Sequence, residues 1–206
     1  MPLKQMGRFT SGGKTFSIKS DIRDMQKQFG SLSRTGFKRA TFRAINRSLT
    51  KSNTATKKAI AAKRNLLSRT VASGMSLKKA NMLDLSAAII GRGEMIPLFA
   101  VKGTKTQKAL GVSVAPERGH RQVIKDSFIS RMPSGHVGIF KREKEGAGES
   151  GRVGRLGIQE LTMPSIAHTL QNKDIIALSI SVFQSSFRVA FANQLNNEIR
   201  KARGGR

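Results

Sequence analysis

The pattern of apolar positions first predicts a long helix over residues 34–69. Apolar or small side chains recur there at steps of three, four or seven residues, as in Phe37, Ile45 and Leu49. Such spacing puts them on one face of an α-helix, and that face can pack on a core. A break in the helix is expected between residues 50 and 56, because six of the seven residues there are polar.

Helical spacing also appears near each end of the chain. Residues 22–30 predict a short helix, and residues 173–202 predict a long one. The long segment carries Phe183, Phe187 and Phe191 at steps of four, which places the three rings on one face. We assign these phenylalanines to packing of the C-terminal helix rather than to a ligand site.

Short apolar or alternating runs between the helices predict strands. They occupy residues 81–91, 96–102, 110–115, 122–132 and 136–141, and a further strand is expected at residues 15–20. No gap between the central runs can hold a crossover helix, so the sheet should be mainly antiparallel, with four to six strands. The predicted fold class is α+β, with N-terminal and C-terminal helices packed on a central sheet.

A length of 206 residues favours one domain over residues 1–206. Its expected parts are a loose basic arm (1–14), a strand and basic helices (15–74), the sheet (75–142), a glycine-rich mobile loop (141–157), and a connector with the C-terminal helix (158–206).

Charge gives the strongest functional indication. The chain has 38 Lys and Arg against 12 Asp and Glu, so its formal net charge is +26. This excess predicts salt-sensitive association with polyanions, namely nucleic acid or an acidic protein surface. There is no acidic residue between Asp24 and Asp84.

Four cations form what we call the basic ladder of the long helix. They follow one another at steps of four residues and are Arg39, Arg43, Arg47 and Lys51. Like charges at this spacing repel by roughly 0.2–0.5 kcal/mol per pair, so the row persists more easily opposite an anion. The ladder is therefore a candidate surface for DNA or an acidic partner; a solvated basic face without a partner is the alternative.

The absence of several residue types excludes some kinds of functional site. The chain has no Cys, which excludes disulfides, thiolate metal sites and a cysteine nucleophile. Trp and Tyr are also absent, leaving 11 Phe, so contacts to nucleic acid should go to phosphates rather than stacked bases. No apolar run is judged long enough for a membrane span and the first residues do not resemble a signal peptide, so no membrane partner is expected.

No catalytic or metal-binding pattern assembles. The three histidines, His120, His136 and His168, lie in different segments without ligand spacing, and no HExxH, GxSxG or Walker pattern occurs. We therefore predict a non-enzyme with no catalytic residue, no metal and no cofactor.

Five stretches between about residues 35 and 170 follow one another in a recognisable order. They are Ala44-Ile45-Asn46-Arg47; Leu85-Ser86-Ala87-Ala88-Ile89 with Ile96-Pro97-Leu98-Phe99; Gly111-Val112; Phe128-Ile129 with His136-Val137-Gly138-Ile139-Phe140-Lys141-Arg142; and Ile158-Gln159-Glu160-Leu161 with Met163-Pro164-Ser165-Ile166. Together they resemble the minor tail protein Z family of long-tailed, lambda-like bacteriophages, whose members are described as tail-completion proteins. Met163 stands where glycine is common in that family.

The resemblance implies a structural virion protein at the head-proximal end of the tail. Such proteins form rings in the neck, commonly six-fold, that allow head and tail to join and position the genome end. The implied partners are a tail terminator or tail tube protein, a head-tail connector (stopper) protein, phage genomic DNA and further copies of the chain. The implied location is the tail neck, with assembly in the host cytoplasm.

Within that picture, two sets of residues are candidate contacts. The basic ladder would line the path of the DNA or bind an acidic neighbouring ring. An inter-subunit or inter-ring contact is assigned to the connector residues Ile158, Glu160, Leu161, Pro164, Ser165 and Ile166. The equally weighted alternative is a buried connector that packs Leu161 and Ile166 under the C-terminal helix.

Two other function classes remain open. The alternative to a tail protein is a free-standing, sequence-independent nucleic-acid-binding protein, for which the charge alone suffices. Oligomerisation discriminates the two, because a ring subunit assembles whereas a simple binder stays monomeric or dimeric without its ligand. A nuclease is a remote third class, because no acidic metal cluster is visible.

Overall fold

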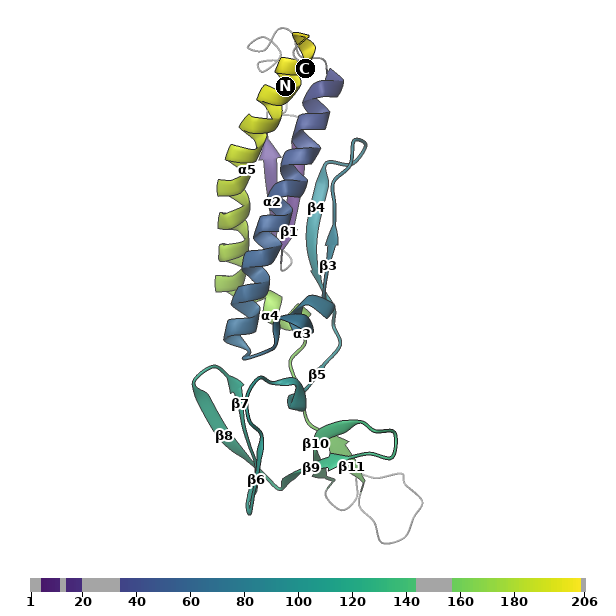
Figure 1. The fold of residues 1–206 in the computed structure, drawn as a ribbon, viewed down its shortest axis with the longest axis vertical. Coiled ribbons are helices and arrows are strands. Elements are labelled where there is room, and N and C mark those ends of the chain that lie inside the picture. Colours follow the sequence, from purple (N-terminus) through teal and green to yellow (C-terminus); the bar gives the residue numbers. More distant parts are fainter. Residues whose placement is uncertain (1–4, 12–13, 20–33, 144–156, 205–206) are drawn as a thin grey trace.

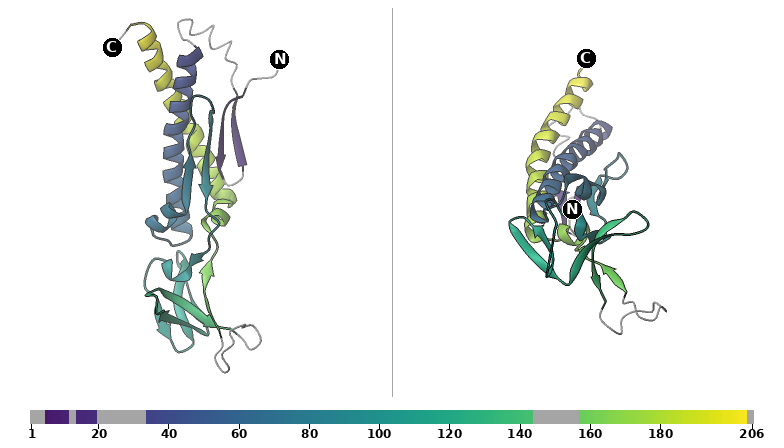
Figure 2. Two further views of the ribbon diagram at one scale, coloured as in Figure 1. Left: turned by 90° about the vertical axis from the view of Figure 1, so that its right-hand side faces the viewer. Right: turned by 60° about the horizontal axis from the view of Figure 1, so that its bottom comes forward.

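The computed structural model describes residues 5–11, 14–19, 34–143 and 157–204. The molecule is elongated, with two long helices along one part and a lobe of short strands at one end (Figure 1). Figure 2 shows the same division in two further views. The predicted helix at residues 22–30 and most of the loop at 141–157 lie outside the described residues.

The elements confirm the α+β class. The helices are α2 (Arg34–Lys63), α3 (Ser68–Ser73), the 3-10 helix η1 (Leu98–Ala100), α4 (Ile166–Leu170) and α5 (Lys173–Ala202). The strands are β1 (Gln5–Ser11), β2 (Lys14–Lys19), β3 (Met75–Lys78), β4 (Ser86–Gly91), β5 (Ile96–Pro97), β6 (Thr106–Lys108), β7 (Gly111–Glu117), β8 (His120–Lys125), β9 (Ser127–Arg131), β10 (Val137–Arg142), β11 (Ile158–Glu160) and β12 (Thr162–Met163).

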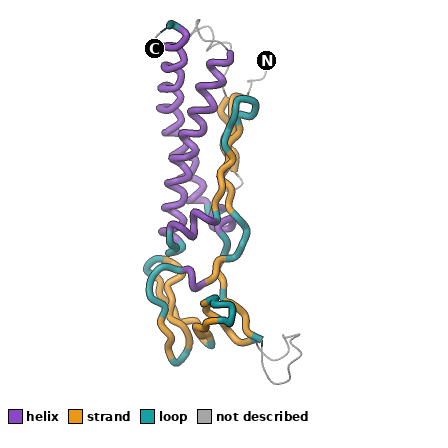
Figure 3. The backbone as a smooth tube through the Cα atoms, turned by 45° about the vertical axis from the view of Figure 1, so that its right-hand side comes forward, coloured by secondary structure: helices purple, strands orange, loops and turns teal. Residues whose placement is uncertain are grey.

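Helices α2 and α5 pack side by side (Figure 3) and run in opposite directions, as the sequence colours of Figure 1 show. The α5 bounds match the prediction, with the Asn172 side chain accepting a hydrogen bond from the Asp174 amide at the start. Small and apolar residues of α2, such as Ala44 and Ile45, are fully buried in the shared core. This pair forms the frame on which the first sheet lies.

The expected break in α2 between residues 50 and 56 is wrong, because the helix is continuous. Its polar side chains bond along the helix instead of interrupting it. The hydroxyls of Thr50 and Thr56 each donate to the carbonyl oxygen four residues earlier, at 3.0 and 2.8 Å. Ser52 donates to the carbonyl oxygen of Ser179 on α5 at 2.7 Å, so hydroxyl groups tie the two helices together.

In the part of the chain that the structure describes, the strands divide among four small sheets rather than one central sheet. The largest has the order β2-β1-β4-β3 and lies along the helices. Residues 5–11, expected in a loose arm, form β1, which pairs with β2 antiparallel and with β4 parallel. The remaining described pairs are antiparallel, as predicted.

The strand lobe joins the helical part at the end of α2. Asn65 adopts φ +47° in the turn that follows the helix, and its side-chain amide donates to the carbonyl oxygens of Lys102 and Ala115. Leu66 forms a β-bridge with Val101, so this turn is pinned to the lobe. The lobe itself is built from the strands β6 to β11 and η1. Residues 96–102, predicted as a strand, contain only the short β5 before the chain turns into η1.

The expectation that no segment is long and apolar enough for a membrane span does not hold for α5. Among the described residues, α5 is long and apolar enough to cross a membrane, with a mean hydropathy of 1.6 over its 18-residue window. Core helices of water-soluble proteins pass the same test, and α5 packs its phenylalanine face on α2. Only 28% of the window is buried, so much of this helix, which carries a single charged residue between residues 175 and 197, faces outward.

Candidate functional site

The basic ladder of α2 divides into two halves. Arg39 and Arg43 both reach Glu198 near the end of α5, with Nη1 to carboxylate distances of 3.5 and 2.9 Å. Arg47 and Lys51 are exposed, and within the described part of the chain neither forms an ion pair. Among the described residues, the anion expected opposite the row is therefore supplied for its first half only.

Glu198 is the buried centre of this charge cluster. Its side chain is 5% exposed and also lies 3.6 Å from Nζ of Lys201. The two arginines are each 43% exposed, so water still solvates them and the pairs are weaker than fully buried ones. Three cations around one carboxylate leave a net positive cluster.

Sequence reasoning did not single out Glu198, although a signal was present. It follows Leu195 by three residues and Phe191 by seven, so it belongs to the face of the helix that carries the apolar stripe. An acid on such a face needs a partner when buried. Which cation supplies it depends on the antiparallel pairing of α5 with α2, which single-chain spacing does not reveal.

The phenylalanine stripe lies in the interface between the two long helices. Phe183 is fully buried and stacks with Phe187 at a centroid distance of 5.9 Å. Phe187 stacks in turn on Phe191 at 5.5 Å, and Phe191 meets the edge of Phe37 on α2 at 5.7 Å. These rings serve packing within the subunit.

The connector residues are placed partly in the core. Ile166 is buried and packs where Gly74 leaves room, since a Cβ on Gly74 would lie 2.6 Å from Cγ1 of Ile166; Gly91 likewise makes room for the backbone of Ala167. Ser165 caps α4 by accepting a hydrogen bond from the His168 amide. Ser165 and Ile166 therefore lie as the alternative of a buried connector predicts.

The other connector residues lie nearer the surface. Leu161 packs on the core while partly exposed, whereas Ile158 and Pro164 are exposed. The carboxylate of Glu160 lies 2.8 Å from Nε2 of His136 on the neighbouring segment of the lobe. Ile158, Glu160 and Pro164 therefore remain available to a neighbouring subunit, and that role stays a prediction.

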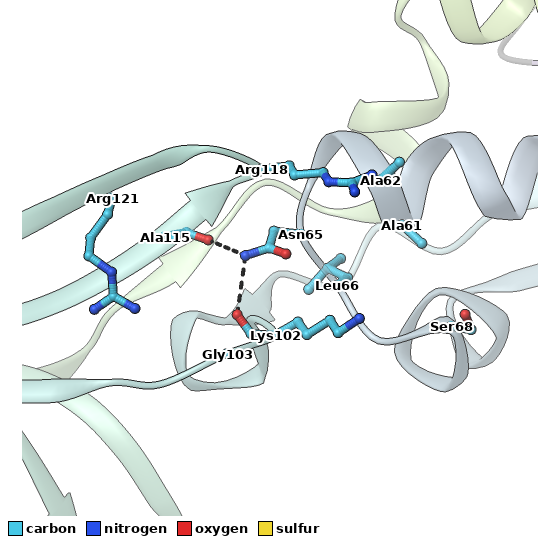
Figure 4. A pocket seen from close by; sticks show the side chains of 10 residues that line it. All are labelled: Ala61, Ala62, Asn65, Leu66, Ser68, Lys102, Gly103, Ala115, Arg118 and Arg121. Carbon is cyan, nitrogen blue, oxygen red and sulfur yellow. Dashed lines mark hydrogen bonds between the residues drawn. The ribbon is translucent and has the colours of Figure 1, made fainter.

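A second basic site lies where α2 meets the β7–β8 hairpin. A pocket of about 460 Å³ opens there, lined by Ala61, Ala62, Asn65, Leu66, Ser68, Lys102, Gly103, Ala115, Arg118 and Arg121. Figure 4 shows Asn65 near its centre, with its amide bonded to two backbone carbonyls. The lining contains three cations and no acid, so this junction pocket favours anions. Its cations come from the loop after η1 (Lys102) and from the β7–β8 hairpin (Arg118 and Arg121), and sequence spacing gave no sign of it.

Catalytic chemistry finds no support in the arrangement of the described side chains. No group of three or more His, Asp or Glu residues gathers there as a metal ion would require. His136 pairs with Glu160, while His120 and His168 lie in β8 and α4, apart from it in the chain.

The comparisons with known proteins give one match. Neither a curated protein nor a solved structure is significantly similar to this chain. A family model described as prophage minor tail protein Z (GPZ) matches residues 20–202, which include both long helices, the strands from β3 to β12 and the connector. Structural tail proteins of this kind point to a non-enzymatic role. The chain therefore belongs to the prophage minor tail protein Z family and is a structural component of a phage tail.

Proposed function

We propose that the chain is a tail-completion subunit at the head-proximal end of a long-tailed phage, where copies form a ring in the neck. The observation that carries the proposal, together with family membership, is the basic face of α2. This helix of 30 residues holds nine Lys and Arg and no acid: residues 34, 38, 39, 43, 47, 51, 57, 58 and 63. Repeated around an axis, such faces attract a DNA end.

The contact with DNA would be made to phosphates, without reading sequence. Arg47 and Lys51 are the exposed half of the ladder, so they are the first candidates to line the DNA path. Arg39 and Arg43 keep half-exposed guanidinium groups although both bind Glu198. Phosphate contacts of this kind release counterions, and affinity therefore falls steeply with salt.

The partners follow from the proposed position in the particle. One face of the ring would meet the tail terminator or tail tube protein, and the other would meet the head-tail connector. A six-fold ring is favoured because it would match the symmetry of the tail tube. An acidic neighbouring ring is the alternative occupant of the ladder, since a carboxylate-rich surface satisfies the same charges.

Electron microscopy of a phage with an early stop codon in this gene tests the proposed position. We expect filled heads and tails of normal length that remain unjoined, or joined particles that do not infect. Supplying the intact gene from a plasmid should restore infectious particles. Complete and infectious particles without the protein would overturn the proposal.

Replacing the exposed half of the ladder tests the DNA contact. The change Arg47→Gln with Lys51→Gln should reduce the slope of log affinity against log salt by about 1.8, because each lost phosphate contact contributes about 0.9. The control is Lys108→Gln with Lys125→Gln, which removes two exposed cations from the strand lobe. An equal effect of both pairs on DNA affinity would contradict a specific DNA-lining role for α2.

The net charge of +26 supports a second candidate, a sequence-independent nucleic-acid-binding protein. This function needs no ring and no other tail protein. It predicts that the purified chain stays monomeric or dimeric without DNA and is absent from finished virions. Mass spectrometry of purified particles distinguishes the two functions.

A further inference from the structure

The side of α5 that faces away from α2 is almost free of charge. It presents Leu178, Val182, Ser185, Val189 and Ala192, which recur at steps of four and three; we call this set the outer face of α5. Leu178 is 39% exposed and Val189 is 61% exposed. Between residues 175 and 197 the helix contains a single charged residue, Arg188. Exposed helix surfaces normally carry many more charges.

A second charge-poor surface lies on the β3–β4 hairpin. Ala87 and Ile89 of β4 point into the core, so Ser86, Ala88 and Ile90 point outward. Ile90 is 47% exposed. The outward side chains of β3 opposite them are Ser76 and Lys78, which pair with Ile90 and Ala88. Lys78 is neutralised by Asp84, whose carboxylate lies 3.2 Å from its Nζ. These residues form the outer face of the hairpin.

The two faces lie on opposite flanks of the subunit. Figure 1 shows α5 on the left, α2 in the middle and the β3–β4 hairpin on the right. Figure 3 shows the same order from another side. A contact between unlike faces on opposite flanks repeats from one copy to the next, and it closes into a ring when the rotation permits.

The charge of the chain indicates what covers these faces. Two copies that each carry +26 repel one another wherever their basic surfaces meet. They can approach through surfaces that carry little charge and offer apolar side chains. An acidic partner, in contrast, would be drawn to α2 or to the junction pocket. The occupant that fits the outer face of α5 is therefore a second copy of this chain.

We propose that the outer face of α5 binds the outer face of the β3–β4 hairpin of a second copy, as the subunit contact of the ring. The inference rests on the ring proposed above. It also predicts that salt affects self-association and DNA binding in opposite directions. Self-association through apolar faces should strengthen as salt screens the repulsion between subunits, whereas DNA binding should weaken.

Sedimentation velocity of the full chain at about 0.1 M and about 1 M NaCl tests this contact, because the screening length shortens from about 10 to 3 Å. Val189→Lys and Ile90→Lys should each weaken self-association by about tenfold or more at 1 M NaCl. Lysine is chosen because an introduced acid could pair with cations of the neighbour. The control Gln122→Lys adds the same charge to an exposed position of β8 and should leave assembly unchanged.

Mixing the two variants tests whether the contact joins unlike faces. Val189→Lys retains an intact hairpin face and Ile90→Lys retains an intact α5 face, so a 1:1 mixture should form mixed dimers that neither variant forms alone. A contact between two α5 helices would instead be unaffected by Ile90→Lys, and this outcome would overturn the proposal. Circular dichroism of each variant verifies that the helices remain folded.

Three further outcomes separate the possible failures. Rings that persist in both variants would refute the assigned faces and leave the ring itself intact. A wild-type chain that is monomeric at both salt concentrations would overturn the contact, while the stop-codon phage still decides whether the chain completes tails. Binding of wild-type chain, but not Val189→Lys, to phosphatidylcholine vesicles without self-association would identify a lipid surface as the occupant and refute the proposal.

Discussion

Helices α2 and α5 are both 30 residues long and pack against one another, yet they divide the chemistry of the surface between them. α2 carries nine cations and no acid, whereas the central 23 residues of α5, from 175 to 197, carry one cation. Their shared interface contains rings and hydroxyl groups. One packed pair of helices thus presents a basic surface on one helix and a charge-poor surface on the other.

The largest effect is expected when the packing between α2 and α5 is damaged, because both surfaces depend on it. Phe183→Ala removes a fully buried ring that stacks with Phe187, and we expect a loss of about 3–5 kcal/mol in the free energy of unfolding. Urea denaturation followed by circular dichroism measures it. Val189→Ala, at an exposed position of the same helix, should change stability by no more than about 0.5 kcal/mol. Equal midpoints for the two variants would show that the stripe does not hold the pair together.

Removing the buried acid should sharpen the contrast between the helices. Glu198→Gln leaves Arg39 and Arg43 without their carboxylate, and we expect a loss of about 1–2 kcal/mol, kept modest because both arginines are half exposed. The freed guanidinium groups should tighten DNA binding and steepen its salt dependence by up to about 1.8 in log–log slope. Fluorescence anisotropy with a DNA duplex measures the second effect. Glu94→Gln, an exposed acid with the same charge change, is the control. DNA affinity raised equally by both changes would mean that net charge alone matters.

The smallest effect concerns the charge-poor hairpin face opposite α5. Hydrogen bonds from the Ser86 side chain and backbone, with Lys78 nearby, lower the pKa of Asp84. A lowered pKa in the folded state means that the carboxylate contributes stability above its unfolded pKa of about 3.9, and that this contribution disappears as pH falls through the folded pKa. In Asp84→Asn the hairpin should lack this stabilisation at pH 7. Its stability should therefore fall less between pH 5 and pH 2 than that of the wild-type hairpin. Amide hydrogen exchange of β3 and β4 is the measurement, and a wild-type hairpin with the same pH response as the variant would contradict it.

The periodic parts of the fold could be predicted from sequence because periodicity reports burial directly. The bounds of α5 were correct, and the alternating runs located most strands of the lobe. The break in α2 was mispredicted because hydroxyl groups that favour loops can also bond within a helix. The strand β1 was missed because a strand paired in parallel with β4 depends on contacts more than 70 residues away.

Of the basic site on α2, the cations could be predicted from the sequence, but their partner could not. The ladder is a local pattern, so its four cations could be read from spacing. The pairing of its first half with Glu198 joins residues 155 and 159 positions apart, which no local pattern encodes. The junction pocket is likewise a product of how the lobe docks on the end of α2.

The docking of the lobe on the end of a long straight helix gives the subunit the properties of a lever. A helix of 30 residues is about 45 Å long at 1.5 Å per residue, and α5 stiffens it along its length. A tilt of about 10° at one end therefore displaces the other by about 8 Å, simply from that length. If the helix pair tilts about its junction with the strand lobe, the far, basic end of α2 therefore moves further than the residues near the junction. No helix has to unfold for this movement.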